Sequence, residues 1–85
     1  MEYWDIAFTD TAKKRISKIP QPEKRRILTA IARLHEGLTG DIKRMKASSD
    51  FRLRVGDWKI ILSVDTSRRF ILVRHVDTRG DIYKH

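Results

Sequence analysis

Residues 51–64 constrain the fold more than any other part of the chain, because they carry its clearest strand pattern. Apolar residues alternate with arginines from position 51 to position 55, which is the period-two pattern of a half-buried strand. A second apolar run, from position 58 to position 64, follows the dipeptide Gly56-Asp57. Glycine at the first position of a two-residue loop suits a type II′ turn, so the stretch predicts a β-hairpin.

The two-residue loop sets the register of this hairpin. It places Arg54 opposite Lys59 and Arg52 opposite Ile61, so that one face is apolar and the other carries three cations. Like charges directly opposite each other destabilise a sheet. Two interpretations therefore stay open: an anion completes the cationic face, or the long side chains splay into water on an ordinary solvated surface.

Size and charge limit the class of protein. Eighty-five residues predict a single domain spanning 1–85, and the formal net charge of +8 predicts an anionic partner. Nucleic acid is the first candidate, an acidic protein the second and an anionic membrane the third. The chain has no cysteine, no signal-peptide pattern and no apolar run of about 18 residues, so we expect a cytoplasmic protein without a disulfide framework or a membrane span.

The residues before the hairpin predict one strand and two helices. Residues 3–8 read as a strand at or near a sheet edge, and residues 9–11 supply N-cap chemistry for a short amphipathic helix that Pro20 ends. A second, core helix lies between Pro22 and Gly37, with its apolar stripe at positions 27, 28, 31, 34 and 38. Residues 39–50 read as a basic loop.

A final strand is expected at residues 70–76, dense enough in apolar residues to be central in the sheet. If residues 65–69 are the whole loop before it, Lys59 pairs with His75, which then joins the cationic face. A slip of one residue would instead put Arg74 on that face and His75 on the core side.

Together these elements predict an α+β domain in the order strand, helix, helix and three strands. Its two N-terminal helices form a helical hairpin packed on one face of a small, mostly antiparallel four-stranded sheet. The other sheet face is left open and bears Arg52, Arg54 and Lys59.

Three stretches carry a resemblance to a known family. The segment Phe-Arg-Leu-Arg-Val-Gly-Asp-Trp-Lys-Ile-Ile at 51–61, the segment Arg-Gly-Asp-Ile-Tyr at 79–83 and the opening strand with its basic helix at 7–19 resemble the RelE/ParE superfamily of bacterial toxins from type II toxin–antitoxin systems. The resemblance covers essentially the whole chain and favours the RelE-like branch. Proteins of that branch cleave messenger RNA in the ribosomal A site without a metal or other cofactor, using the RNA 2′-OH as nucleophile. ParE-like proteins instead inhibit DNA gyrase by binding it.

The resemblance also implies a set of catalytic residues. The two alternating basic residues before the hairpin turn correspond to Arg52 and Arg54, and a cation early in the next strand corresponds to Lys59. The arginine after the last strand and the tyrosine that follows correspond to Arg79 and Tyr83. Position 59 usually holds arginine in the family, and lysine keeps the charge but lacks the planar fork that grips a phosphate. The spacing from 79 to 83 is not that of every active member.

RNA self-cleavage needs a deprotonated 2′-OH, stabilisation of the extra charge on the phosphate and a proton for the departing 5′-oxygen. The cationic face suits the second task. A tyrosine ordinarily ionises only near pH ~10, so Tyr83 acts as a base if cations favour its phenolate, and otherwise stacks on a nucleobase. Histidine transfers protons readily near neutral pH, which makes His75 a candidate beside the simpler structural role. Lys43, Arg44, Lys46 and His75 are expected to contact the RNA.

These observations predict a toxin that acts as an mRNA endonuclease on the ribosome. A ParE-like gyrase inhibitor and a non-toxic basic RNA-binding module are the alternatives. The expected partners are a cognate antitoxin, in a possible hetero-oligomer, together with the ribosome and mRNA. Three scattered histidines and no cysteine predict no metal site.

Overall fold

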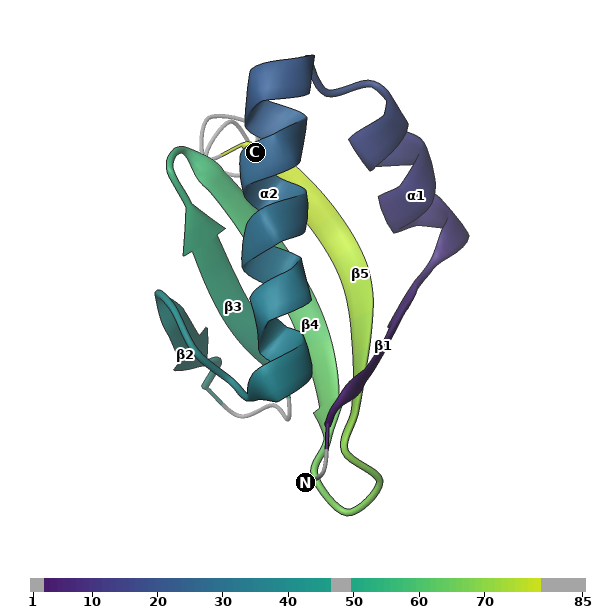
Figure 1. Ribbon diagram of the computed structural model, residues 1–85, viewed down its shortest axis with the longest axis vertical. Coiled ribbons are helices and arrows are strands. Elements are labelled where there is room, and N and C mark those ends of the chain that lie inside the picture. The colour runs from purple at the N-terminus through teal and green to yellow at the C-terminus, as the bar shows by residue number, and fades with distance from the viewer. Residues whose placement is uncertain (1–2, 47–49, 79–85) are drawn as a thin grey trace.

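The computed structural model describes residues 3–46 and 50–78. Helices and strands follow one another as β1 (Asp5–Phe8), α1 (Asp10–Ser17), α2 (Gln21–Arg33), the 3₁₀ turn η1 (Leu34–Glu36), β2 (Ile42–Arg44), β3 (Asp50–Val55), β4 (Trp58–Asp65) and β5 (Phe70–Thr78). The strands form one sheet in the order β1-β5-β4-β3-β2. Figure 1 shows α2 lying across one face of this sheet, with α1 beside it near β5 and β1. No helix of the described segments is long and apolar enough to cross a membrane.

The predicted α+β class is confirmed, but the predicted four-stranded sheet is wrong. The sheet has five strands, because residues 42–44 of the expected basic loop form the edge strand β2. Ile42 lies opposite Leu53, and the Arg54 backbone N–H donates to the Asp41 carbonyl at 2.9 Å. A strand of three residues has too few positions to show a period in the sequence, so its pairing with β3 decides its conformation.

The sheet is also mixed. Strand β1 pairs in parallel with β5, with Ile6 opposite Ile71 and Phe8 opposite Val73. The three other strand pairs are antiparallel. Strands joined by a tight hairpin must be antiparallel, whereas β1 and β5 are separated by most of the chain and their relative direction is not set by a local turn.

Both helices begin and end near the predicted positions. Thr9 is the N-cap of α1, and its hydroxyl accepts a hydrogen bond from the Ala12 N–H at 3.1 Å. Pro22 lies in the first turn of α2, and Gly37 follows η1. The predicted stripe was wrong at Leu28, which is 39% exposed, because the buried positions of α2 are the narrower set Ile27 and Ile31.

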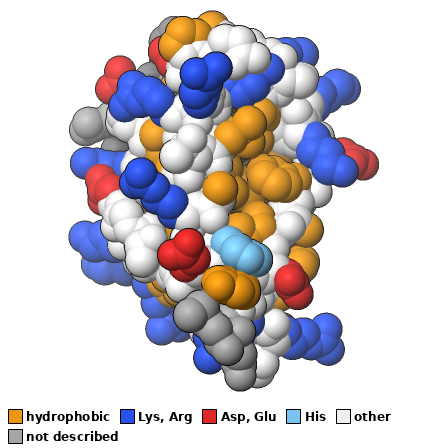
Figure 2. All heavy atoms as spheres, viewed as in Figure 1, with side chains coloured by type: hydrophobic (Ala, Val, Ile, Leu, Met, Phe, Trp, Pro, Cys, Tyr) orange, Lys and Arg blue, Asp and Glu red, His pale blue; other side chains and the backbone are white. Residues whose placement is uncertain are grey.

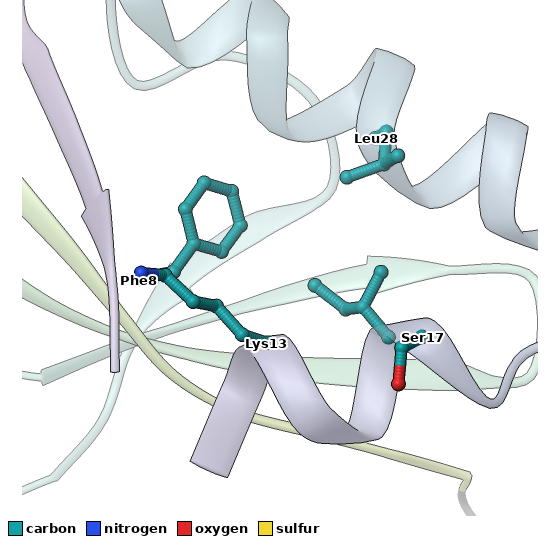
Figure 3. Close-up of a pocket in the computed structure, with 5 residues that line it drawn as sticks. Phe8, Lys13, Ser17 and Leu28 are labelled. Carbon is teal, nitrogen blue, oxygen red and sulfur yellow. The ribbon is translucent and has the colours of Figure 1, made fainter. Parts of the chain in front are cut away.

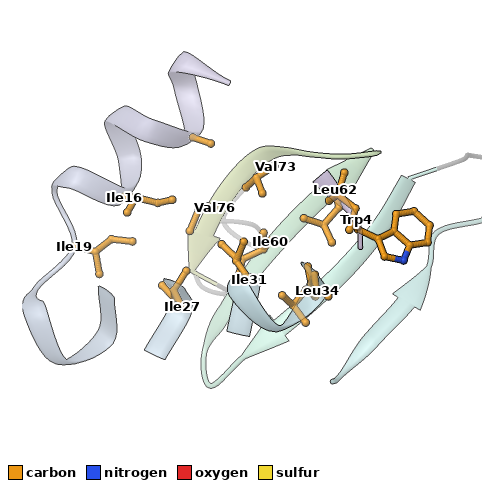
Figure 4. Packing of buried hydrophobic residues seen from close by; sticks show 13 residues of the cluster. Trp4, Ile16, Ile19, Ile27, Ile31, Leu34, Ile60, Leu62, Val73 and Val76 are labelled. Atoms are coloured by element: carbon orange, nitrogen blue, oxygen red, sulfur yellow. The ribbon is translucent and has the colours of Figure 1, made fainter. Parts of the chain in front are cut away.

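One hydrophobic core fills the space between the helices and the sheet (Figure 4). Each large aliphatic side chain that is fully buried contributes about 1.5–3 kcal/mol. The largest side chains with under 2% exposure come from α2, η1, β3, β4 and β5: Ile27, Leu34, Leu53, Ile60, Leu62, Ile71, Val73 and Val76. The core therefore occupies the helix-covered side of the sheet and leaves the other side to solvent.

The hairpin register matches the prediction at every pair from Val55 and Trp58 to Arg52 and Ile61. Gly56 adopts φ +60°, the left-handed conformation that the first loop position of a type II′ turn requires. The sequence alone therefore determined the geometry of this hairpin correctly.

The predicted register between β4 and β5 was wrong. Asp65 pairs with Phe70 and Ile61 with His75, so Lys59 lies opposite Asp77 rather than His75. Two causes add: the loop has one residue fewer than expected, with Arg69 in the left-handed region at φ 50°, and a β-bulge shifts the ladder between Ile61 and Leu62.

Candidate functional site

The sheet face opposite the helices gathers most of the predicted site. We call it the open face and define it by alternation along the strands and by the pairing of residues across them. On the neighbouring positions of the same strands, Leu53, Ile60 and Val76 are buried in the core. The open face comprises Lys43, Asp50, Arg52, Arg54, Lys59, Ile61, Ser63, Leu72, Arg74, His75 and Asp77.

Cross-strand pairing arranges these side chains in rows. One row crosses β2 to β5 as Lys43, Arg52, Ile61 and His75. Neighbouring strands lie about 4.8 Å apart, so the backbones of the second and fourth members of this row are separated by roughly 9.5 Å. The row is cationic at one end, apolar in the middle at Ile61 and ends in an imidazole.

The next row, toward the hairpin turn, contains Arg54, Lys59 and Asp77. Arg54 also forms an ion pair with Asp41, with 3.2 Å between its Nε and the carboxylate Oδ2. Both side chains are more than half exposed, so this pair adds little stability. The pair uses one of the five N–H donors of the Arg54 guanidinium.

A polar network occupies the other end of the open face and joins three strands. The Asp50 carboxylate accepts a hydrogen bond from the Ser63 hydroxyl at 3.0 Å and one from Arg74 Nη1 at 3.1 Å. The Asp50 side chain is only 20% exposed. A partly buried carboxylate with two donors holds its neighbours more firmly than a surface ion pair does, so Asp50 orders this end of the face.

Not every predicted site residue joins the open face. Arg44 lies opposite Phe51, whose side chain packs against the core, so Arg44 belongs to the other side of the sheet. Lys46 is exposed in the turn that follows β2. Arg79 and Tyr83 lie outside the described residues; β5 is described to Thr78, which pairs with Trp58 beside the hairpin turn.

The structure adds residues that the sequence did not single out. Asp50 continues the alternation of Arg52 and Arg54 by one step, and that spacing was a usable signal. Asp41 and Ser63 gave no such signal, because their importance comes from partners on other strands.

The helix side of the molecule presents a different surface. Figure 2 views this side and shows lysine and arginine side chains spread around apolar ones between α2 and α1. A hollow of about 280 Å³ opens there, lined by Phe8, Lys13, Ile16, Ser17 and Leu28 (Figure 3). His35 lies on η1, where its ring stacks on Tyr3 and its Nδ1 is 2.8 Å from the Trp4 carbonyl oxygen, which is a structural arrangement.

Within residues 3–46 and 50–78, no three side chains of histidine, cysteine, aspartate or glutamate cluster in a way that could hold a metal ion. The open face instead offers Lys43, Arg52, Arg54 and Lys59 on adjacent strands. Such a flat cationic surface on a protein with net charge +8 suits the phosphates of a nucleic acid chain.

Fold and site together define a class: a small basic α+β protein with two helices on one side of a mixed sheet and a cationic face on the other. No family model matches the chain. It is 26% identical to Toxin RelG of Mycobacterium tuberculosis over 88 residues, which cover 95% of this chain and 97% of that protein.

Comparison with solved structures also finds RelE proteins. The chain is similar to the archaeal RelE–RelB complex of Pyrococcus horikoshii, with a TM-score of 0.79 and 20% identity over 91% of this chain and 96% of that one. It is also similar to the RelB–RelE antitoxin–toxin complex of Methanococcus jannaschii, with a TM-score of 0.76 and 29% identity over 91% and 94% of the two chains. The chain is thus similar to RelE-like toxins in sequence and in fold over nearly its whole length, in agreement with the resemblance seen in the sequence.

Proposed function

We propose that this protein is a single-domain type II toxin that cleaves messenger RNA on the ribosome, and that the open face is its RNA-binding and catalytic surface. The observation that carries the proposal is the group of four cations in two adjoining rows of the open face, Lys43 with Arg52 and Arg54 with Lys59, on a RelE-like fold. Action on a ribosome-bound message would take place in the cytoplasm.

In this proposal the cations bind the phosphate at the cleaved bond. Phosphoryl transfer to the 2′-oxygen adds negative charge to the phosphate, and fixed donors that meet this charge lower the barrier. Arg52 and Arg54 can each present several N–H donors, and Lys59 supplies a compact charge between them and β5. Arg79 and Tyr83 would add an arginine and a phenol to the same site, and the ribosome would position the message.

Asp77 reduces the positive charge around Lys59. The Asp77 carboxylate faces Lys59 directly across β4 and β5, so the net charge of this row is smaller than its two cations alone would make it. The strongest unbalanced positive charge therefore lies in the row of Arg52, and we place the phosphate beside Arg52, above Ile61, rather than at the hairpin turn.

A cognate antitoxin is the second partner. The P. horikoshii and M. jannaschii relatives were solved as complexes of RelE with RelB. We propose that the antitoxin of this protein neutralises it by covering the open face with acidic side chains, in a toxin–antitoxin hetero-oligomer. Addition of the antitoxin should then abolish both RNA binding and cleavage.

The direct test uses purified protein, ribosomes programmed with a defined message and mapping of the new RNA ends. We expect cuts within the A-site codon, with Arg52→Ala slower by roughly 10²-fold, the usual effect of removing one donor to a developing charge. Arg25→Ala is the matched control, because Arg25 is an exposed arginine on the helix side and should leave the rate unchanged.

Uncut message on ribosomes saturated with the protein would refute the proposal. In that case a gyrase supercoiling assay tests the ParE-like alternative, since loss of supercoiling would assign the protein to that branch. Expression that neither arrests growth nor affects gyrase would leave the alternative of a non-toxic basic RNA-binding module.

A further inference from the structure

The β-bulge in β5 changes which side chains reach the open face. Leu62 pairs with Val73 and Ile61 with His75, which leaves Arg74 as the extra residue in the ladder. Val73 and Val76 are both buried although they are three positions apart, an odd spacing that regular alternation forbids. Arg74 and His75 therefore both lie on the open side, whereas an unbroken strand would send one of them into the core.

Two residues from distant parts of the chain, Thr9 and Asp50, hold the bulge. The Thr9 hydroxyl donates to the Arg74 carbonyl at 3.0 Å while the Thr9 N–H donates to the Val73 carbonyl at 3.0 Å. On the side-chain end of the same residue, Arg74 Nη1 donates to Asp50 at 3.1 Å. Backbone and side chain of the bulged residue are thus attached to the start of α1 and to β3.

His75 owes its place to this arrangement. It is exposed, and among the described residues its imidazole has no hydrogen-bond or ion-pair partner. Its strand neighbour Ile61 separates it from Arg52, so an apolar residue lies between a cation and an imidazole whose backbones are about 9.5 Å apart. Lys59 and Asp77 occupy the adjoining row.

We propose that His75 is the general acid of RNA cleavage, and that Thr9 and Asp50 are positioning residues that act through the bulge. This rests on the proposed function. In the step, the 2′-oxygen forms a bond to phosphorus and gives its proton to solvent, the bond from phosphorus to the 5′-oxygen breaks, and the imidazolium of His75 donates its proton to that oxygen. The products are a 2′,3′-cyclic phosphate, a 5′-hydroxyl and a neutral imidazole that water reprotonates.

The chemistry favours His75 over its cationic neighbours for this task. A general acid works best when it can give up its proton near the working pH, as an imidazolium does and an arginine does not. Arg52 and Lys59 are suited to hold the phosphate, and His75 lies at the far end of the same row from Arg52, where a leaving group could depart.

A sulfur substitution tests the proton donation directly. Ribosomes are programmed with a message whose cleaved linkage carries sulfur in place of the bridging 5′-oxygen, because a thiolate leaves without a proton. We expect His75→Ala to slow cleavage of the normal message by roughly 10²-fold or more. On the sulfur message the same variant should cut within about tenfold of the wild-type rate, since general acid catalysis is no longer needed.

Equal losses on the two messages would overturn the role of His75 while leaving the proposed function intact. Wild-type protein that cuts neither message would overturn the proposed function and this inference with it.

The positioning role has its own readout. Thr9→Val removes the hydroxyl and Thr9→Ser keeps it, so the valine variant should lose much more rate on the oxygen message than on the sulfur message, while the serine variant behaves as wild type. Asp50→Asn provides a second, independent test if the valine variant folds poorly. A variant that is merely less stable would lose rate equally on both messages, and that result for both Thr9→Val and Asp50→Asn would refute the positioning role.

Discussion

Replacing Thr9 with valine should destabilise the whole domain, because this one side chain makes two hydrogen bonds, one local and one to a residue 65 positions away. Its hydroxyl accepts from the Ala12 N–H at the first turn of α1 and donates to the Arg74 carbonyl in β5. Thr9 is partly buried, so water replaces these partners only in part. Valine keeps the shape of threonine and removes both bonds.

The size of the effect follows from the two bonds. Loss of a threonine N-cap costs about 1 kcal/mol. Loss of the bond to the Arg74 carbonyl costs about another 1 kcal/mol, within the usual range for a partly buried hydrogen bond. The expected loss in the free energy of unfolding is thus about 2 kcal/mol, which for a domain of this size lowers the Tm by roughly 8–16 °C.

Urea unfolding followed by circular dichroism measures this loss, since a domain of this length is expected to unfold in one step. With a slope of about 2 kcal/mol per molar urea, the midpoint should fall by roughly 1 M. Thr9→Ser should stay within about 0.5 kcal/mol of wild type because it keeps the hydroxyl. Thr11→Val, two positions along and exposed, should likewise change stability by no more than about 0.5 kcal/mol. A Thr9→Val protein as stable as either control would contradict the contribution assigned to these two hydrogen bonds.

Three further predictions concern single residues. Gly56→Ala should lower the free energy of unfolding in urea by about 1–2 kcal/mol, because φ is +60° at this position. The added carbon would also come within 3.0 Å of the Arg26 guanidinium, whose flexible end can move away. An unchanged urea midpoint would contradict the backbone strain. Lys59→Ala should reduce the slope of log affinity for single-stranded RNA against log salt concentration by about 0.7. Lys59→Arg should keep the slope and tighten binding. Equal slopes for the wild type and both variants would exclude a phosphate contact by Lys59. The pKa of Asp65 lies below its ordinary value of 3.8, because the Ser67 hydroxyl and then the Arg68 N–H donate to the carboxylate. A depressed pKa contributes stability that is present above the ordinary value and is lost as pH falls, so NMR titration should find the Asp65 midpoint below 3.8 and Ser67→Ala should raise it.

The hairpin of β3 and β4 and the start of each helix could be predicted because their causes are local. A two-residue turn with glycine first sets the pairing of Arg54 with Lys59, and alternation then sends the arginines to one face. Thr9 before α1 and Pro22 in the first turn of α2 act on backbone groups within a few residues. For the same reason, the cationic part of the candidate site was visible in the sequence.

Three features of the fold were decided by contacts between distant segments. Strand β2 is too short for a pattern and exists because β3 offers an edge to pair with. The parallel direction of β1 depends on β5, which lies at the other end of the described chain. The bulge that brings His75 to the open face depends on a hydrogen bond between residues 65 positions apart, from Thr9 to Arg74.

The sequence by itself thus determined that the domain has two helices, a strand hairpin and a group of cations on the side away from the core, because helix-end signals, turns and alternation act over a few residues. Only the tertiary structure decided which further side chains join those cations. The alternation of side chains along β5 is interrupted at Arg74 by the bulge. Thr9 and Asp50, which hold the bulge, contact Arg74 only once the sheet is assembled.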